Sequence, residues 1–464
     1  MSRTPRNPPP GALRLPTPTP RASLAPPRLA AEPTVRMDPW VLIAFLYPFS
    51  QLVMFELVGQ LYLIDLLAFP LLLVLLLRLP DAYARLARIW PLAVLLGVWL
   101  TGQVVTDLYR ATPIEDLMRG WAKIVFFAAQ LFALWLWLPR RRAYLVAFAM
   151  GVGVAAIFGV PEDFESDAWK FGYDRALVLL TIGSLVIASV VFPRLRYLAP
   201  LLFLAIAVFL LLQSARSAFG VLFICAILAA AALVFARSVR LRERLTAGIY
   251  SVMLLFGVAA AVGATGIYGQ AVETGALGRE ALIKYRDQTS GEVPLLLGGR
   301  TESLVSVRAI ADSPIIGHGS WAKDPYYVGL HYATKLKLGL PVFDPGQGKQ
   351  RLIPTHSYLM GAWVEAGIAG GLFWLWVLLL PFVALYSLLR RVEPLMPLVV
   401  YCSVSLVWSV LFSPFGATER VLVAFQLVVL SWTITIHGGR LVLAPLFRRG
   451  ASRAPLGQGA RAGA

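Results

Sequence analysis

His356 and two arginines, Arg216 and Arg300, are the residues of this sequence best suited to chemistry. His356 is one of four histidines and opens the apolar run of "IPTHSYLMGAWVEAGIAGG" at 353–371. Thr355 is expected to cap a helix that begins at His356, and the positive end of that helix disfavours imidazolium. A neutral imidazole can take a proton from a hydroxyl, whereas a histidine bonded to a carbonyl is structural. The residues alone leave both roles open.

Arg300 precedes a predicted short helix in "GGRTESLVSVRAIADSPIIGHGSW". Thr301 is expected to cap this helix, an apolar face is expected at Leu304, Val307 and Ile310, and Pro314 is expected to end it. A cation, a helix N-terminus and the preceding Gly298-Gly299 pair together suit a phosphate group. The alternative is an arginine that only solvates a loop.

Arg216 lies between two apolar runs in "LLLQSARSAFGVL". Charged side chains at membrane depth are costly and are usually functional, although an arginine at the interface can also snorkel into water. Arg308, eight residues after Arg300, is a weaker second candidate for the same ligand.

The composition predicts that a bilayer surrounds the elements that carry these residues. The chain has 464 residues, of which 58% are hydrophobic and 14% are charged. Soluble domains carry about 25% charged residues. About twelve stretches have the length and hydropathy of spanning helices. They lie at 39–56, 59–77, 89–106, 119–138, 143–160, 175–192, 197–213, 218–236, 248–268, 357–388, 394–412 and 420–439. The predicted fold class is therefore an all-α polytopic membrane protein.

The arginines predict the orientation of these helices. With the N-terminus inside, every predicted cytoplasmic segment is basic, for example Arg140, Arg141 and Arg142, as the positive-inside rule requires. The net charge of +17 is then mostly an orientation signal, and we expect no nucleic-acid partner. This numbering places a loop of about 85 residues, 269–354, outside the membrane between the ninth and tenth spans.

Two tails flank the predicted membrane domain at 39–440. Residues 1–38 form a proline- and arginine-rich segment that is expected to be disordered in the cytoplasm. Residues 441–464 form a second cytoplasmic tail. Cys225 and Cys402 both fall within spans and predict no disulfide.

Metal binding has little support in the sequence. His318, His331 and His356 are spaced by 13 and 25 residues, which matches no usual zinc pattern. An acidic run, Glu162 to Asp167, lies in the third outside loop and suits either a metal or acceptor role or a solvated charge run. No metal or other cofactor is therefore predicted.

A set of motifs resembles the superfamily of O-antigen ligases and O-antigen polymerases, which are bacterial membrane glycosyltransferases. The matching positions are Gly299-Arg300, Pro314, Gly317, Gly319, His356-Ser357, Glu365, Gly367, Gly370 and the turn at Arg216. The motifs cover about residues 210–375, and the predicted spans and large loop fit the rest. Many members carry a tryptophan shortly after Gly-Arg, where this chain reads Thr301-Glu302-Ser303-Leu304, so the subgroup stays open.

The resemblance implies transfer of an undecaprenyl-diphosphate-linked glycan to an acceptor hydroxyl, at the periplasmic face of the bacterial inner membrane. The acceptor is lipid A-core for a ligase and a lipid-linked glycan for a polymerase. The family is thought to need no metal and to invert the sugar carbon. It implies that Arg300 and Arg216 hold the diphosphate, that His356 is the general base, and that Gly299 and Ser357 contact substrate.

Other roles stay open beside this one. A polysaccharide or lipid transporter would use charged or broken helices at the bilayer midplane, yet Asp65 and Lys123 are among the few charges within the spans. A structural scaffold is a further alternative. Glu365 lies near the opposite helix face from His356 and is expected to position the helix. Tyr326, Tyr327 and Tyr332 could stack on sugars or form local core.

Overall fold

A computed structural model describes residues 38–160, 167–275, 278–289, 300–342, 352–390 and 393–437 of the chain. The described residues are 82% helical and contain almost no strand, which confirms the all-α prediction. Within them, seven helices are long and apolar enough to cross a membrane, and three shorter apolar helices accompany these. The protein is therefore a multi-pass membrane protein.

Each predicted apolar stretch coincides with a helix. The main helices are α1 (Pro39–Leu46), α2 (Leu63–Arg78), α4 (Trp90–Tyr109), α5 (Ile114–Trp137), α6 (Arg142–Phe158), α8 (Tyr173–Val191), α9 (Ala199–Leu212), α10 (Arg216–Arg237), α12 (Ala247–Glu273), α17 (Tyr358–Ala366), α18 (Ile368–Arg390), α19 (Met396–Phe412) and α20 (Arg420–Ile436). Short helices α3 (Ala82–Leu86), α7 (Ala168–Phe171) and α11 (Val239–Arg244) join some of them.

The first predicted stretch is too long at its end. Helical structure stops at Leu52, and β1 (Met54–Glu56) pairs with β2 (Gln60–Tyr62) in an antiparallel hairpin. Arg119 of α5 donates from Nε to the Val58 carbonyl in the hairpin turn. This contact with a distant helix favours a hairpin where hydropathy alone predicts a continuous helix.

The tenth predicted span is two helices rather than one. Gly367 has φ +60° between α17 and α18, and a Cβ there would collide with the carbonyl of Ile315. The next amide, of Ile368, donates to that same Ile315 carbonyl at 3.1 Å. A segment from the large loop thus inserts at the break, and only glycine allows so close an approach.

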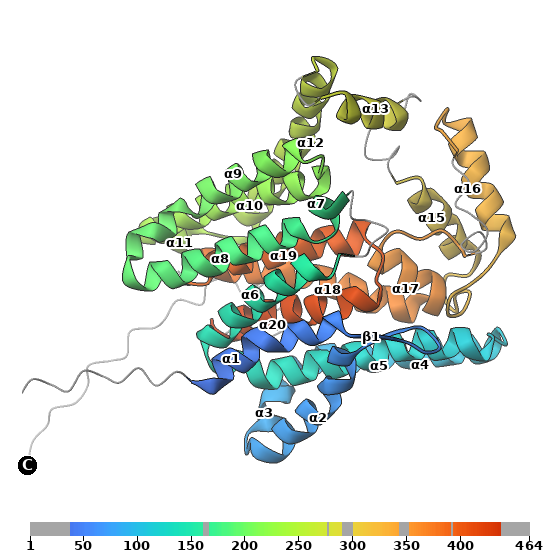
Figure 1. Ribbon diagram of the computed structural model, residues 1–464, viewed down its shortest axis with the longest axis horizontal. Helices are drawn as coiled ribbons and strands as arrows, with labels where there is room; N and C mark the ends of the chain where they lie inside the picture. The colour runs from blue at the N-terminus through green and yellow to red at the C-terminus, as the bar shows by residue number, and fades with distance from the viewer. Residues whose placement is uncertain are drawn as a thin grey trace, which may run out of the picture. The chain divides into compact units, whose positions relative to one another are not determined.

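An aromatic core supports α17 from within the membrane domain. Tyr358, the first residue of α17, lies 5.0 Å from Trp374 and 5.1 Å from Phe415 between ring centroids. Trp99 of α4 stacks on Phe373 at 5.0 Å. Helices α4 and α5 lie beside α17, α18 and α20 (Figure 1). The residues just before Tyr358 are therefore anchored to the best-packed part of the protein.

The described part of the large loop contains three helices, α13 (Gly278–Thr289), α15 (Glu302–Asp312) and α16 (Pro325–Lys337), and α15 packs on α17 (Figure 1). The helix predicted after Arg300 is confirmed, and its predicted apolar face is right only at Ile310, which packs against the buried cluster around Val305. Leu304 and Val307 are 43% and 55% exposed, whereas Val305 and Ala309 are buried. The reason is that α15 turns Val305 and Ala309 toward Val364 of α17.

Candidate functional site

Arg300 lies immediately before the first turn of α15. Its side chain is half-buried, and burial lowers the pKa of its guanidinium while the nearby Glu302 carboxylate opposes this shift. Thr301 occupies the cap position, but its hydroxyl makes no cap bond and lies 2.9 Å from Nε2 of His331. The predicted Thr301 cap is therefore wrong, because the hydroxyl bonds to α16 instead.

The start of α17 is capped by Ser357. Its Oγ accepts a hydrogen bond from the amide of Met360 at 3.1 Å and donates to the carbonyl of Val410 at 2.7 Å. The helix begins at Tyr358, so the prediction that Thr355 caps a helix starting at His356 is wrong. The hydroxyl proton of Ser357 is committed to α19, and its contact with substrate stays a prediction.

His356 and Arg300 lie within electrostatic reach of each other. Burial lowers the pKa of His356 most, and the positive charges of Arg300 and Lys170 lower it further, while Glu302 raises it. The direction is the one predicted from the sequence. Its main cause is burial, however, because His356 precedes the cap and lies outside the first turn of the helix. The imidazole is held neutral beside a cation.

A buried serine ties α15 to the segment before His356. Ser306 is fully buried, and its Oγ lies 2.9 Å from the carbonyl oxygens of both Glu302 and Pro354. The amide of Ile353 also donates to the carbonyl of Ala322 at 2.9 Å. Ile353 and Pro354, which shortly precede His356, are therefore held by Ala322 and by α15.

Glu302 is the carboxylate that Arg300, His331 and His356 share. Its Oε1 lies 3.9 Å from Nε2 of His331, and its negative charge raises the pKa of all three residues against the effect of burial. Burial lowers the pKa of His331, Glu302 opposes this and Lys335 adds to it. Glu302 follows Arg300 by two residues, a spacing that could have singled it out.

Lys170 of α7 also belongs to this environment through its effect on His356. It follows the acidic run by a few residues, and nothing in its own sequence context marks it.

The other two arginines make contacts on different elements. Arg216 is the first residue of α10, and its guanidinium lies over the ring of Tyr268 in α12, 5.7 Å from the centroid. Arg308 pairs with Asp312 one turn along α15 at 3.0 Å, and its side chain is 58% exposed. Arg300 thus lies in the electrostatic surroundings of His356, while the roles of Arg300, Arg216 and Arg308 in phosphate binding stay predictions.

Several predicted residues have other partners or lie outside the described chain. His318 bonds through Nε2 to the carbonyl of Ala309 at 2.8 Å. Tyr327 is buried and its hydroxyl donates to Asp312 at 2.9 Å, so it forms local core, whereas Tyr326 is 58% exposed. Gly299, Glu162, Asp163 and Glu165 lie outside the described residues.

In the described segments, no group of three or more acidic, histidine or cysteine side chains could hold a metal ion.

Comparisons with known proteins add no relative: no family model, no curated protein and no solved structure matches the chain.

Proposed function

We propose that this protein transfers a glycan from undecaprenyl diphosphate to an acceptor hydroxyl, as an O-antigen ligase does. The observation that carries the proposal is the packing of α15 on α17 together with the Ser306–Pro354 bond, which brings the half-buried Arg300 close enough to lower the pKa of His356. A diphosphate leaving group needs a cation, and an attacking hydroxyl needs a base. Arg300 and His356 each lie two residues before the first residue of their helix, α15 and α17.

The proposed reaction assigns one task to each residue. His356 accepts the proton of the acceptor hydroxyl as its oxygen attacks the anomeric carbon of the donor. The bond from that carbon to the diphosphate oxygen breaks, and the leaving group departs with its electron pair. Arg300 holds the developing negative charge through two parallel N–H donors, with Arg216 as a second cation. Attack opposite to the leaving group inverts the sugar carbon.

The membrane part of the proposal has twelve spans with both tails in the cytoplasm. The large loop then faces the periplasm, where lipid-linked glycans are presented. The long apolar helices and the basic predicted inside segments support this arrangement. The acceptor is lipid A-core for a ligase, and a polymerase with a lipid-linked acceptor is the alternative within the same chemistry.

Deletion of the gene, followed by analysis of the surface glycan, tests the proposal. Polymer that is lost from lipid A-core but retained on the carrier indicates a ligase, and single repeat units in place of long chains indicate a polymerase. The purified protein in proteoliposomes is then given donor and acceptor together. Movement of lipid across the bilayer without glycan transfer would show that the protein is a transporter rather than an enzyme.

A further inference from the structure

Residues 313–320, here called the bridge segment, follow α15 in the chain and make backbone hydrogen bonds with α17. These are the two helices that carry the candidate site. Within the segment, the amide of His318 donates to the carbonyl of Val364 at 2.7 Å, and the amide of Gly319 donates to that of Glu365 at 3.0 Å. The ring of His318 donates from Nε2 to the carbonyl of Ala309 in α15. One residue therefore bonds to both α15 and α17.

Two glycines give the bridge segment a backbone conformation that other residues rarely adopt. Gly317 and Gly319 have φ +86° and +95°, in the region that favours glycine. A Cβ on Gly317 would lie 2.5 Å from the amide nitrogen of Gly367 and 2.8 Å from the carbonyl oxygen of Glu365. The segment cannot shift along α17 without losing these backbone contacts.

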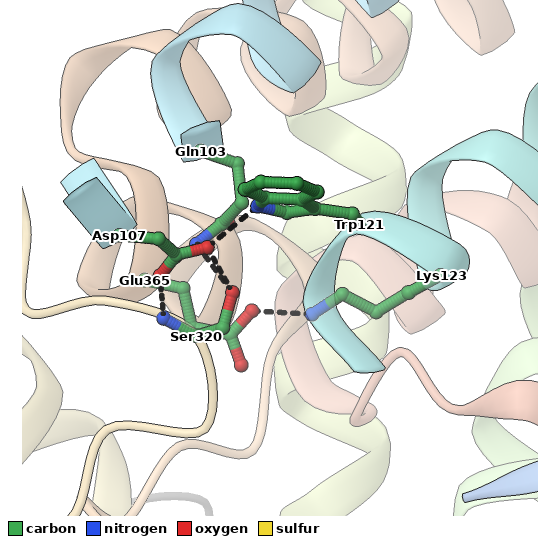
Figure 2. A network of polar contacts seen from close by, with 6 residues as sticks. All are labelled: Gln103, Asp107, Trp121, Lys123, Ser320 and Glu365. Atoms are coloured by element: carbon green, nitrogen blue, oxygen red, sulfur yellow. Dashed lines mark hydrogen bonds and ion pairs between the residues drawn. The ribbon is translucent and has the colours of Figure 1, made fainter. Parts of the chain in front are cut away.

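Asp107, near the end of α4, holds the last residue of the bridge segment. Its carboxylate accepts from the amide and the hydroxyl of Ser320 at 2.6 and 2.7 Å, and from Trp121 Nε1 at 2.8 Å. Thr112 donates to it at 3.0 Å, and Gln103 lies 3.4 Å away. Figure 2 shows Gln103 and Asp107 of α4, Trp121 of α5 and Ser320 of the bridge segment converging. Asp107 is 1% exposed.

Further residues of α4 and α5 hold the same region. Arg110 donates to the carbonyl of Gly317 at 2.9 Å and to the hydroxyl of Ser313 at 2.8 Å. Lys123 of α5 pairs with Glu365 on the α17 side (Figure 2). Arg110, directly after α4, thus holds the bridge segment at Ser313 and Gly317, and Asp107 holds it at Ser320. Lys123 of α5 holds α17 through Glu365.

We propose that Asp107 is a positioning residue that fixes the bridge segment and thereby sets the distance between Arg300 and His356. This inference rests on the proposed transfer reaction. The path has few steps. Asp107 bonds to Ser320, and His318, two residues earlier, bonds to both α15 and α17. Arg300 and His356 lie just before the first residues of these two helices. A reacting pair that is displaced by about 1 Å can lose roughly 100-fold in rate, even when the mutated residue is remote.

Two substitutions perturb this arrangement by different means. Asp107→Asn keeps the shape but turns an amide N–H₂ toward either the Ser320 amide or the Trp121 indole, which are both donors. Gly120→Ala leaves every polar group in place, but its new methyl group would collide with the side chain of Ser320. Gly97→Ala on α4 is the matched control, because a Cβ there meets nothing within 4 Å.

The assay is glycan transfer by the full-length protein in proteoliposomes, at varied donor concentration and pH. Asp107→Asn and Gly120→Ala are expected to lower kcat about 10–100-fold and to leave the KM for the donor unchanged. Gly97→Ala is expected to match wild type.

The acid limb of the pH profile reports on the separation itself. The groups that act on His356 are Arg300, Lys170 and Glu302. In the two variants a looser site exposes His356 and weakens the effect of Arg300, so the acid limb moves to higher pH. A variant that merely contained less folded protein would lower kcat without moving the limb.

Wild-type kcat and an unmoved acid limb in Gly120→Ala would overturn the proposal. If Asp107→Asn does not fold, Trp121→Phe replaces it, because phenylalanine keeps a ring but removes one donor to Asp107. Normal turnover in both Trp121→Phe and Gly120→Ala would then count against a positioning role. Arg300→Ala and His356→Ala in the same assay separate this failure from that of the reaction: if these two retain activity, the proposed function itself is wrong.

Discussion

Replacement of His356 by glutamine tests the general base most directly. Glutamine keeps a hydrogen-bonding group but cannot take a proton, and it leaves the start of α17 intact, since Ser357 caps the helix and Tyr358 anchors it. A positioned base contributes about 10²–10⁴-fold, which corresponds to about 3–5 kcal/mol of activation free energy. We expect His356→Gln to lose transfer by that factor.

The same substitution has a much smaller expected effect on folding. His356 is half-buried and supplies no cap, so a change of about 1 kcal/mol in the free energy of unfolding is expected. Donor binding is expected to stay at the wild-type level, because Arg300 remains in place. A loss of donor affinity equal to the loss of rate would show that His356 binds the donor rather than acting as a base.

The lowered pKa of His356 determines how the rate and the stability change with pH. The pKa of His356 lies below its usual value of 6.5, so the base stays available as the pH falls through 6.5, and the acid limb of the rate lies lower. Below about 6.5 the unfolded chain binds the proton more readily than the folded one, so wild type loses stability there. His356→Gln lacks both responses. Wild-type turnover in this variant would refute the assignment and make His356 structural.

Three further predictions concern the cation, the topology and the helix break. Arg300→Ala is expected to lower the donor affinity and the rate of transfer at least about 100-fold, with partial rescue in Arg300→Lys and no loss in the exposed control Arg286→Ala. EDTA is expected to leave transfer intact. Loss of transfer in EDTA that a divalent ion reverses would point to a metal. Ala333→Cys, exposed in α16, is expected to react with an impermeant maleimide from outside intact cells, since both native cysteines are buried; labelling only after permeabilisation would reverse the topology. Gly367→Ala is expected to lower the melting temperature through its φ of +60° and its clash with the Ile315 carbonyl, and an unchanged melting temperature would contradict that account of the break.

Hydropathy predicts a helix in each apolar stretch, although the first ends early and the tenth is broken, because a bilayer imposes length and apolar composition on each helix separately. The prediction of a helix after Arg300 also succeeded, since its cap position, spacing and terminal proline are local signals. The errors arose where a distant element changed a local outcome. Val305 rather than Val307 is buried because α17 packs on that side, and Thr301 bonds to His331 rather than capping its helix.

Ser320 is another residue whose surroundings are set by a distant element. It falls in a glycine-rich stretch of the large loop, a pattern typical of exposed residues, yet it is 2% exposed. Its two bonds to Asp107 join residues 213 positions apart in the chain. Periodicity and motif spacing contain no information on such a pair.

The same long-range contacts explain why candidate chemical residues are easier to propose from the sequence than the residues that support them. A candidate base and a candidate cation are proposed from residue type and from neighbours a few positions away, as His356 and Arg300 were, and their roles stay predictions. A positioning residue is defined only by what it touches, and Asp107 on its own is one carboxylate near the end of an apolar helix. Its burial beside four hydrogen-bonding residues makes an unpaired carboxylate there costly, so these residues and the bridge segment have to move together. A site built from separate loop and membrane elements therefore depends on residues that carry no chemical signature of their own.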